Sequence, residues 1–333
     1  MPLKIDLNDK EIQFALKVAR AGATIAKRVR ALPHIRSLTK SDDSPVTLAD
    51  MAIQAVAAGL LIRSFRQGSL VAEERADWLR SPEGRADLER VGEYVRTFFP
   101  EVSPLDLCDW IDRGRGAPSK TFWTLDPIDG TRGFLRGGQY ATALALVRDG
   151  ELRIATLACP NLRGSGALAQ RGGILVLAVK GKGCWGTALE GEDRWVPFKV
   201  SECRDPRQAR VLESVEMNHR NGDRSRRFRD ALGIQQDPLK LDSQAKHVVL
   251  AMGGAEIFFR TLPPHQLERR EKIWDVAPGA LAIEEAGGRV TDLEGRPLDY
   301  GCGEVLSRSP GFVATNGFLH EIVLDMLSRA RGG

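Results

Sequence analysis

The chain has 333 residues, of which 42% are hydrophobic and 28% are charged, and 48 basic against 44 acidic residues leave a formal net charge of +4. This composition is typical of a globular protein with one large core or two of ordinary domain size, and it excludes disorder for the bulk of the chain. No window reaches the roughly 18 consecutive apolar residues of a membrane span, and the N-terminus lacks the apolar core of a secretory signal. We therefore expect a cytoplasmic protein without a membrane partner.

The first half of the chain predicts helices followed by an antiparallel sheet. Apolar residues at helical spacing predict an amphipathic helix over residues 9–30 and a second helix that begins at Thr47. Residues 77–116 are polar and predict an excursion with helical stretches only. The strands expected in this half lie at residues 69–72, 122–125, 140–147, 152–157, 174–179 and 184–189, with a hairpin turn at Asp149-Gly150.

The second half alternates strands with helices and predicts an α/β arrangement. Strands are expected at residues 209–214, 255–260, 289–291 and 311–315, and helices at residues 222–233, 242–252, 275–286 and after Asn316. The basic run at residues 220–229 is interpreted as a solvated helix face, so no nucleic-acid partner is expected. We place the boundary between two domains at residues 203 and 204, which gives an N-terminal domain (1–203) and a C-terminal domain (204–333).

Cysteines and histidines supply no metal-binding pattern. The five cysteines are scattered and never form a C-x-x-C pair, and the five histidines form no H-E-x-x-H motif. A disulfide framework and a structural zinc site are therefore not expected. A metal bound by this chain must take carboxylate ligands, which indicates a hard cation such as Mg²⁺.

The most informative motif runs from Asp126 to Thr131 (DPIDGT). A strand ends at Asp126, Pro127 turns the chain, and Gly130 permits a tight geometry that folds Asp129 back toward Asp126. A divalent cation would remove the repulsion between the two carboxylates and accept the carbonyl oxygen of Ile128. The alternative is an exposed Asp-Pro turn, but the complete string beside an apolar strand favours the metal site.

Three further acidic positions are candidates, and each has a plainer interpretation. Glu73-Glu74 follows an apolar strand, as Asp126 does, but such a pair is often simply solvated. Asp275 opens a helix and has Pro278 in its first turn, so it fits an N-cap as well as a ligand. Asp50 completes the string Thr47-Leu-Ala-Asp50, and its spacing alone favours a capping box. An EF-hand and a P-loop are both excluded by the residue pattern.

Taken together, these strings resemble the lithium-sensitive, magnesium-dependent phosphatase superfamily that includes inositol monophosphatase. The resemblance is carried by residues 126–131, by 274–279 with 285–288 after them, and by the Glu73-Glu74 pair, in this order across nearly the whole chain. It implies a layered αβαβα sandwich, α+β with an antiparallel sheet in the N-terminal part and α/β in the C-terminal part.

Within that superfamily the chain is most similar to the 3′(2′),5′-bisphosphate nucleotidases. The strings that favour this branch are residues 40–50, 132–139, 213–219 and 241–246, together with Arg260. The resemblance implies hydrolysis of the 3′-phosphate of adenosine 3′,5′-bisphosphate and of its 5′-sulfated counterpart. The alternatives are an inositol monophosphatase or inositol polyphosphate 1-phosphatase of the same fold, a nucleotide-responsive binding protein with a degenerate site, and an RNA-binding protein.

The resemblance also implies roles for individual residues. It implies that Asp50 and Thr131 orient and deprotonate the attacking water, in addition to any capping by Asp50. It implies two or three Mg²⁺ ions and a monomer or homodimer. The ligands implied for the metal are Glu73, Asp126, the Ile128 carbonyl, Asp129 and Asp275, and the positions implied for the nucleotide are Thr131, His219, Ser243, Lys246, Arg260 and Asp275.

This sequence departs from the family pattern at two places. Ala72 stands where a glycine usually precedes the glutamate pair, and residues 77–116 do not match closely.

Overall fold

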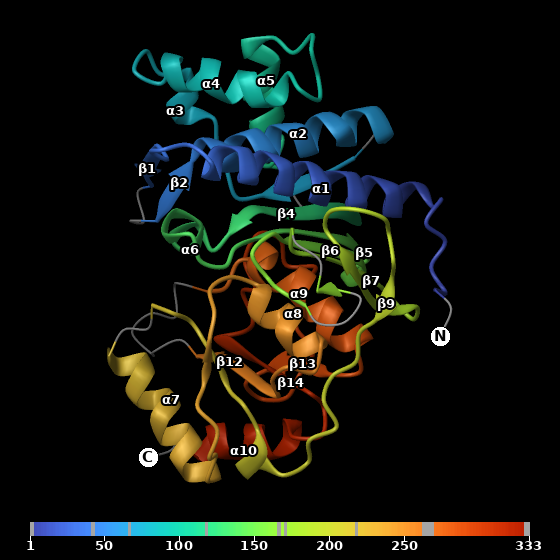
Figure 1. Cartoon of the computed structure of the whole chain (residues 1–333), viewed down its shortest axis with the longest axis vertical. Helices are drawn as coiled ribbons and strands as arrows, with labels where there is room; N and C mark the ends of the chain where they lie inside the picture. Colours follow the sequence, from blue (N-terminus) through green and yellow to red (C-terminus); the bar gives the residue numbers. More distant parts are fainter. Residues whose placement is uncertain are drawn as a thin grey trace.

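The chain folds into five stacked layers in which helices alternate with sheets (Figure 1). This computed structural model describes residues 3–40, 44–65, 68–116, 119–164, 168–169, 172–216, 219–261 and 270–329, without the side chains of residues 219–221. The layers are two long helices, a seven-stranded sheet, two central helices, a three-stranded sheet and two outer helices. The predicted αβαβα sandwich is confirmed.

The first layer consists of α1 (Lys10–Arg30) and α2 (Leu48–Ser64). Helix α1 begins where the carboxylate of Asp9 accepts hydrogen bonds from the backbone of Glu11 and Ile12, and its last turn is basic, as the helix dipole favours. Both helices pack apolar side chains against one face of the large sheet. The small helices α3 (Asp77–Arg80), α4 (Arg85–Val95) and α5 (Pro104–Asp112) lie on the outer side of α2, in the region predicted as an excursion (Figure 1).

The seven-stranded sheet has the order β3-β4-β5-β6-β7-β8-β9, and only β3 runs parallel to its neighbour. The predicted hairpin is confirmed, because Asp149 and Gly150 both adopt positive φ angles between β5 and β6. The strands are β3 (Leu70–Ala72), β4 (Thr121–Asp129), β5 (Ala141–Arg148), β6 (Glu151–Cys159), β7 (Ile174–Val179), β8 (Gly183–Ala188) and β9 (Val196–Pro197).

The central helices α8 (Ala245–Ala251) and α9 (Ile273–Glu285) cover the other face of this sheet. Beyond them lies an antiparallel sheet of β12 (Ile257–Thr261), β14 (Gly311–Thr315) and β13 (Arg289–Asp292), in that order. Its outer face is covered by α7 (His219–Leu232) and α10 (His320–Arg329). The short strands β10 (Leu212–Glu213) and β11 (Leu239–Lys240) form a parallel pair, which a bridge from Val211 to Ile257 links to β12.

Several elements differ from those predicted. The helix expected from residue 242 begins at Ala245, and the helix expected from residue 275 begins at Ile273. The helix α6 (Thr131–Arg136), the short 3-10 turn η2 (Pro206–Gln208) and the small hairpin of β1 (Ser37–Thr39) with β2 (Pro45–Thr47) were not predicted. The elements α6, η2, β1 and β2 are too short to show a clear periodicity in the sequence.

The largest hydrophobic cluster contains residues from both sides of the boundary expected at residues 203 and 204. Phe122 and Val147 of the large sheet belong to the same cluster as Val248, Trp274 and Phe312. The division into two domains stays a prediction. Within the described residues, no helix combines the length and hydropathy needed to cross a bilayer.

Candidate active site

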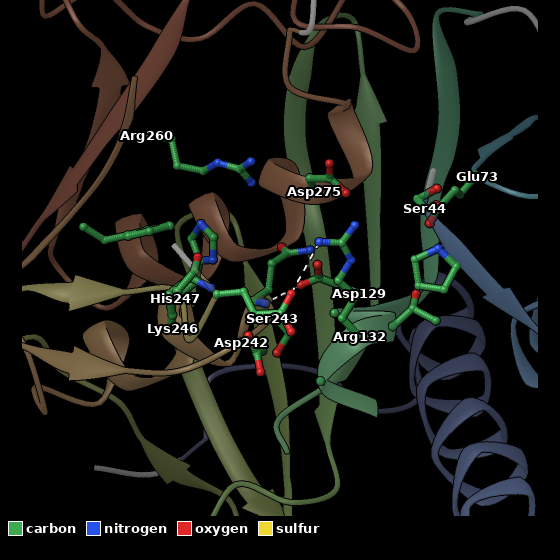
Figure 2. Close-up of a pocket in the computed structure, with 18 of the residues that line it drawn as sticks. Ser44, Glu73, Asp129, Arg132, Asp242, Ser243, Lys246, His247, Arg260 and Asp275 are labelled. Atoms are coloured by element: carbon green, nitrogen blue, oxygen red, sulfur yellow. Dashed lines mark hydrogen bonds and ion pairs between the residues drawn. The ribbon is translucent and has the colours of Figure 1, made fainter. Parts of the chain in front are cut away.

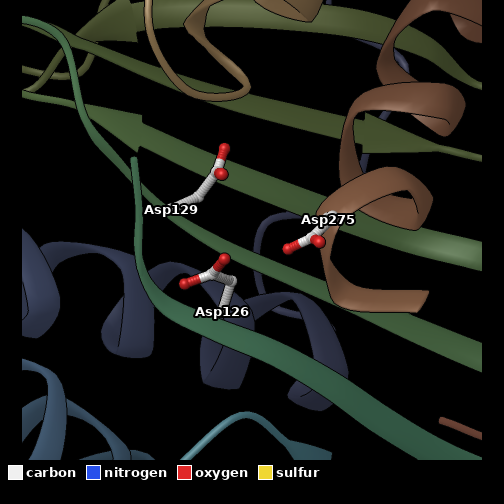
Figure 3. A group of neighbouring side chains, drawn as sticks. All are labelled: Asp126, Asp129 and Asp275. Atoms are coloured by element: carbon white, nitrogen blue, oxygen red, sulfur yellow. The ribbon is translucent and has the colours of Figure 1, made fainter. Parts of the chain in front are cut away.

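Three aspartates meet where β4 ends beside the first turn of α9 (Figure 3). Asp126, Asp129 and Asp275 each offer a carboxylate oxygen, and these oxygens all lie within 4.8 Å of one another. Asp275 is not the N-cap of its helix, because Lys272 holds that position without a side-chain capping bond. The structure therefore brings together acids that are far apart in the sequence.

A bulge in β4 explains how Asp126 and Asp129 come to the same side. Asp126 pairs with Ala143 of β5 and Asp129 pairs with Ala141, so β4 carries one extra residue between these two pairs. Residues three apart on a regular strand point to opposite faces, and the extra residue cancels this alternation. The prediction that the strand stops at Asp126 is therefore wrong, since the bulge lets the strand continue through Pro127.

The residues after the bulge hold the loop against α8. Gly130 has a φ of 83°, and a Cβ built on it would lie 2.8 Å from the Cβ of Ser243, so both conformation and contact require glycine here. The hydroxyl of Thr131, the first residue of α6, donates a hydrogen bond to the Ile128 carbonyl at 3.1 Å. The backbone N–H of Gln244 donates to a carboxylate oxygen of Asp129.

Gln244 also holds α9 in place. Pro278 is the sixth residue of α9 rather than part of its first turn, so it leaves the Trp274 carbonyl without the usual helical donor. The side-chain amide of Gln244 donates to that carbonyl at 2.9 Å and accepts from the N–H of Gly279 at 2.9 Å. This residue therefore ties Asp129 to the helix that carries Asp275.

The acidic cluster has the properties of a cation site. Asp126 is 2% exposed, and one of its carboxylate oxygens has no hydrogen-bond partner among the described residues. Burial raises the pKa of Asp126 well above its ordinary value, and the charges of Glu73 and Asp129 raise it further. Burial and the charge of Asp129 raise the pKa of Asp275 well above its ordinary value. Burial also raises the pKa of Asp129, to about 6, although the positive charge of Lys246 opposes this change. A set of oxygen ligands with unbalanced negative charge, of which Asp126 is buried and Asp129 and Asp275 are partly buried, fits a hard divalent cation.

Glu73 lies across the same cavity, beside Ser44 (Figure 2). It follows β3, whose Ala72 pairs with Leu125 of β4, so Glu73 and Asp126 emerge from adjacent parallel strands as expected. The ammonium of Lys40 lies 2.6 Å from Glu73 and 2.7 Å from Glu74. Glu74 is 2% exposed, so the interpretation of the pair as a solvated loop is wrong for this residue.

Asp50 forms the capping box that its spacing predicts. One of its carboxylate oxygens accepts hydrogen bonds from the backbone and hydroxyl of Thr47 at 2.8 and 2.6 Å. Its other oxygen is buried and lacks a partner in the described part of the chain. Burial raises the pKa of Asp50 to about 7, with a smaller contribution from Glu73. One oxygen of this carboxylate therefore caps α2, and the other, which has no partner among the described residues, is available for a second role.

Basic residues form the other end of a cavity of about 340 Å³ (Figure 2). Lys246 is buried, which lowers its pKa to about 8, and its ammonium donates to the Leu241 carbonyl at 3.1 Å. Arg260 is half-exposed, and its Nε lies 3.1 Å from a carboxylate oxygen of the buried Glu271, which raises the pKa of the guanidinium. Ser243 and Thr131 also line this cavity, whereas the side chain of the predicted His219 lies outside the described residues.

The cavity also contains residues that had no predicted role at the site, although several lie in the strings 40–50, 132–139, 213–219 and 241–246. Asp242, Gln244 and His247 are adjacent to predicted positions, so their proximity was a usable signal. Phe312 comes from a strand near the C-terminus and carries no such signal. The complete additional set is Ser44, Pro45, Arg132, Gly133, Ser214, Glu216, Asp242, Gln244, His247, Phe258 and Phe312.

The fold is that of the inositol monophosphatases. A solved inositol monophosphatase from Anabaena superposes on 95% of this chain and 94% of its own, with a TM-score of 0.62 at 18% sequence identity. The model of the inositol monophosphatase family matches residues 7–328. The chain belongs to this family, which is metal-dependent.

Two curated relatives are more similar in sequence than the solved structure. A 3′(2′),5′-bisphosphate nucleotidase from Schizosaccharomyces pombe is 34% identical over 337 residues, covering 95% of this chain and 94% of the relative. A 3′(2′),5′-bisphosphate nucleotidase from Oryza sativa is 38% identical over 313 residues, covering 88% and 86%.

Proposed function

We propose that the chain is a Mg²⁺-dependent 3′(2′),5′-bisphosphate nucleotidase that removes the 3′-phosphate of adenosine 3′,5′-bisphosphate and of its 5′-sulfated counterpart. The observation that carries this proposal is a single cavity with a carboxylate cluster at one end and Lys246 and Arg260 at the other. Such a cavity suits a substrate with two anionic groups, of which one reacts and the other is held. The names of the relatives from S. pombe and O. sativa support the same substrate.

The acidic residues are proposed to hold two or three Mg²⁺ ions. Asp126, Asp129 and Asp275 form the closest group, and Glu73 and the Ile128 carbonyl complete the proposed set. When bound, Mg²⁺ supplies Lewis-acid activation of the phosphate and of the attacking water. The oxygen of Asp126 that has no partner among the described residues supports its role as a ligand.

The remaining steps are assigned to side chains of the protein. The Asp50 oxygen that does not cap α2 and the hydroxyl of Thr131 are proposed to orient the water and take its proton. A pKa of about 7 makes Asp50 suited to accept a proton near neutral pH. Lys246, Arg260, Ser243 and His219 are proposed to position the nucleotide.

A comparison of substrates in one assay tests this proposal. Phosphate release is measured with adenosine 3′,5′-bisphosphate, inositol 1-phosphate and inositol 1,4-bisphosphate at equal concentrations, with Mg²⁺ and with EDTA. We expect the highest kcat/KM for the nucleotide and no release in EDTA. A higher kcat/KM for either inositol phosphate would replace the nucleotidase proposal with the inositol phosphatase alternative, and no release from any substrate would favour a binding protein.

Asp50→Asn is expected to lower kcat by about 10²–10⁴-fold, which is the range that a positioned general base contributes. The variant keeps an oxygen that can cap Thr47, so the melting temperature should change little. Since Asp50 is not a proposed ligand, the increase in melting temperature caused by Mg²⁺ should persist. Initial rates and thermal unfolding with and without Mg²⁺ measure both effects.

The chain offers a matched control in a second capping box. Asp106 accepts hydrogen bonds from the backbone and hydroxyl of Ser103 at the start of α5, but this pair is exposed. Asp106→Asn therefore makes the same chemical change at a helix cap away from the cavity, and kcat should stay unchanged. An equal loss of kcat in both variants would show that capping, rather than catalysis, explains the effect of Asp50.

A further inference from the structure

His247 of α8 is a buried histidine whose polar atoms have no partner within the described chain. The residue is 3% exposed and lines the cavity, and neither Nδ1 nor Nε2 makes a hydrogen bond to any described residue. Figure 2 shows the ring on the same side of the cavity as Lys246 and Arg260. Because an unpaired buried polar atom destabilises a fold, two of them on one ring require an explanation.

The surrounding residues prevent this ring from turning toward another partner. The Phe312 ring lies nearly parallel to it, with centroids 5.9 Å apart, and the Phe258 ring meets it edge-on at 5.2 Å. On α9, Gly279 leaves room for the imidazole, since a Cβ there would lie 2.3 Å from the Cγ of His247. The packing therefore fixes the ring at the wall of the cavity.

The ring is neutral at physiological pH. Burial, together with smaller contributions from the charges of Lys246 and Arg260, lowers the pKa of His247 to about 3. A neutral imidazole carries one N–H donor and one nitrogen that accepts. Lys246 is close by, because its ammonium lies 5.4 Å from the centroid of the same Phe258 ring that contacts His247.

We propose that His247 is a specificity-determining residue that donates a ring N–H to the second anionic group of the substrate, beside Lys246 and Arg260. This inference rests on the proposed function of the cavity, in which the carboxylate cluster holds the phosphate that reacts. The two cations balance the charge of an anion, and the neutral imidazole adds a directional hydrogen bond without adding charge. The hydrogen bond also satisfies a nitrogen that has no partner among the described residues.

A second buried histidine provides a matched control. His320 of α10 is fully buried, and its ring nitrogens lie 2.9 Å from the hydroxyl of Thr291 and 3.0 Å from the hydroxyl of Thr315. Its hydrogen bonds are thus satisfied by the protein, which is the pattern of a structural histidine.

The test compares His247→Phe with His320→Phe. Phenylalanine preserves the aromatic packing around position 247 and removes two nitrogens that have no partner among the described residues, so the melting temperature should stay equal or rise. The KM for adenosine 3′,5′-bisphosphate should rise about tenfold or more, as expected for the loss of a hydrogen bond to a charged group, with kcat nearly unchanged. The KM for adenosine 3′-monophosphate, which lacks the second anionic group, should not change. His320→Phe should lower the melting temperature and leave both KM values unchanged.

An unchanged KM for the bisphosphate in a folded His247→Phe variant would overturn the inference, as would equal increases for the two nucleotides. A measurement on the wild-type protein covers the case in which the variant does not fold. The ¹⁵N chemical shifts of the His247 ring should change when adenosine 5′-monophosphate is added with Mg²⁺, while those of His320 should not. Unchanged His247 shifts at saturating nucleotide would also overturn the inference. If the wild-type enzyme releases no phosphate from the bisphosphate, the proposed function fails instead.

Discussion

Asp126→Asn is expected to lower kcat by at least about a thousandfold and to raise the melting temperature of the metal-free protein. The substitution keeps the shape of the side chain and removes one charge from a cluster in which burial, Glu73 and Asp129 all disfavour ionisation. Metal activation contributes several kcal/mol to transition-state stabilisation, which corresponds to at least about a thousandfold in rate. The melting temperature in EDTA should rise because the buried repulsion is gone. Single-turnover phosphate release and thermal unfolding in EDTA measure the two effects.

Asp87 supplies the control for this variant. Its carboxylate is also fully buried, but it is paired with Arg36 at 2.8 Å and accepts from the indole of Trp78 at 2.9 Å, away from the cavity. Asp87→Asn should therefore lower the melting temperature, because it weakens the ion pair of a buried carboxylate with a half-exposed arginine, and leave kcat unchanged. Retained turnover in Asp126→Asn would mean that the chemistry lies elsewhere in the protein.

The metal-free protein should become less stable as the pH rises from about 6.5 to about 8, and saturating Mg²⁺ should reduce this dependence. The folded-state pKa values of Asp50, Asp126 and Asp275 are raised above their unfolded values, to about 7 for Asp50 and well above the ordinary value for the other two. The folded protein then binds more protons than the unfolded chain, so stability that is present at low pH is lost as the pH rises through these folded-state pKa values. Mg²⁺ should oppose the part of this loss that comes from the proposed ligands Asp126 and Asp275, since a bound cation favours their ionised form.

Other groups define the limits of this interval. The pKa of His247 is lowered to about 3 and that of His320 to about 4. Both histidines therefore make the stability rise with pH below their ordinary pKa of 6.5. The pKa of Lys246 is lowered to about 8, so this residue makes the stability rise with pH above about 8. Chemical unfolding at several pH values in EDTA and in MgCl₂ measures the dependence. A stability in EDTA that is flat or rises across the interval would contradict the electrostatic picture, and Asp126→Asn should reduce the slope.

The long elements of the fold could be predicted because their patterns are local. The apolar stripe of α1 and the Asp149-Gly150 hairpin each depend on residues close together in the sequence. The bulge in β4 could not be predicted, because the pairing with β5 determines where the extra residue lies. The start of α9 was misplaced because Pro278 favours a first-turn position, whereas Gln244 compensates for it inside the helix.

In the candidate site, too, the features with local sequence patterns could be predicted and those set by tertiary contacts could not. The DPIDGT string and Asp275 were found as motifs, and the structure brings their carboxylates together. For Asp50, spacing predicted the cap but not the buried oxygen left without a partner among the described residues. The residues around the His247 ring, Phe258, Phe312 and Gly279, come from three separate elements, and only tertiary packing reveals them. Local signals therefore identify reacting groups more readily than the residues that enclose them.

One hydrophobic core extends from the large sheet to the small one, and the walls of the cavity are built on it. Asp126 is anchored on β4, and Lys246 is anchored on α8, which packs against α9 within that core. A shared interior of this kind resists hinge opening between its parts. The separation between the carboxylate cluster and Lys246 is therefore set by the core. If the proposed function is correct, a molecule with a longer spacer between its two anionic groups should occupy only one of these positions at a time.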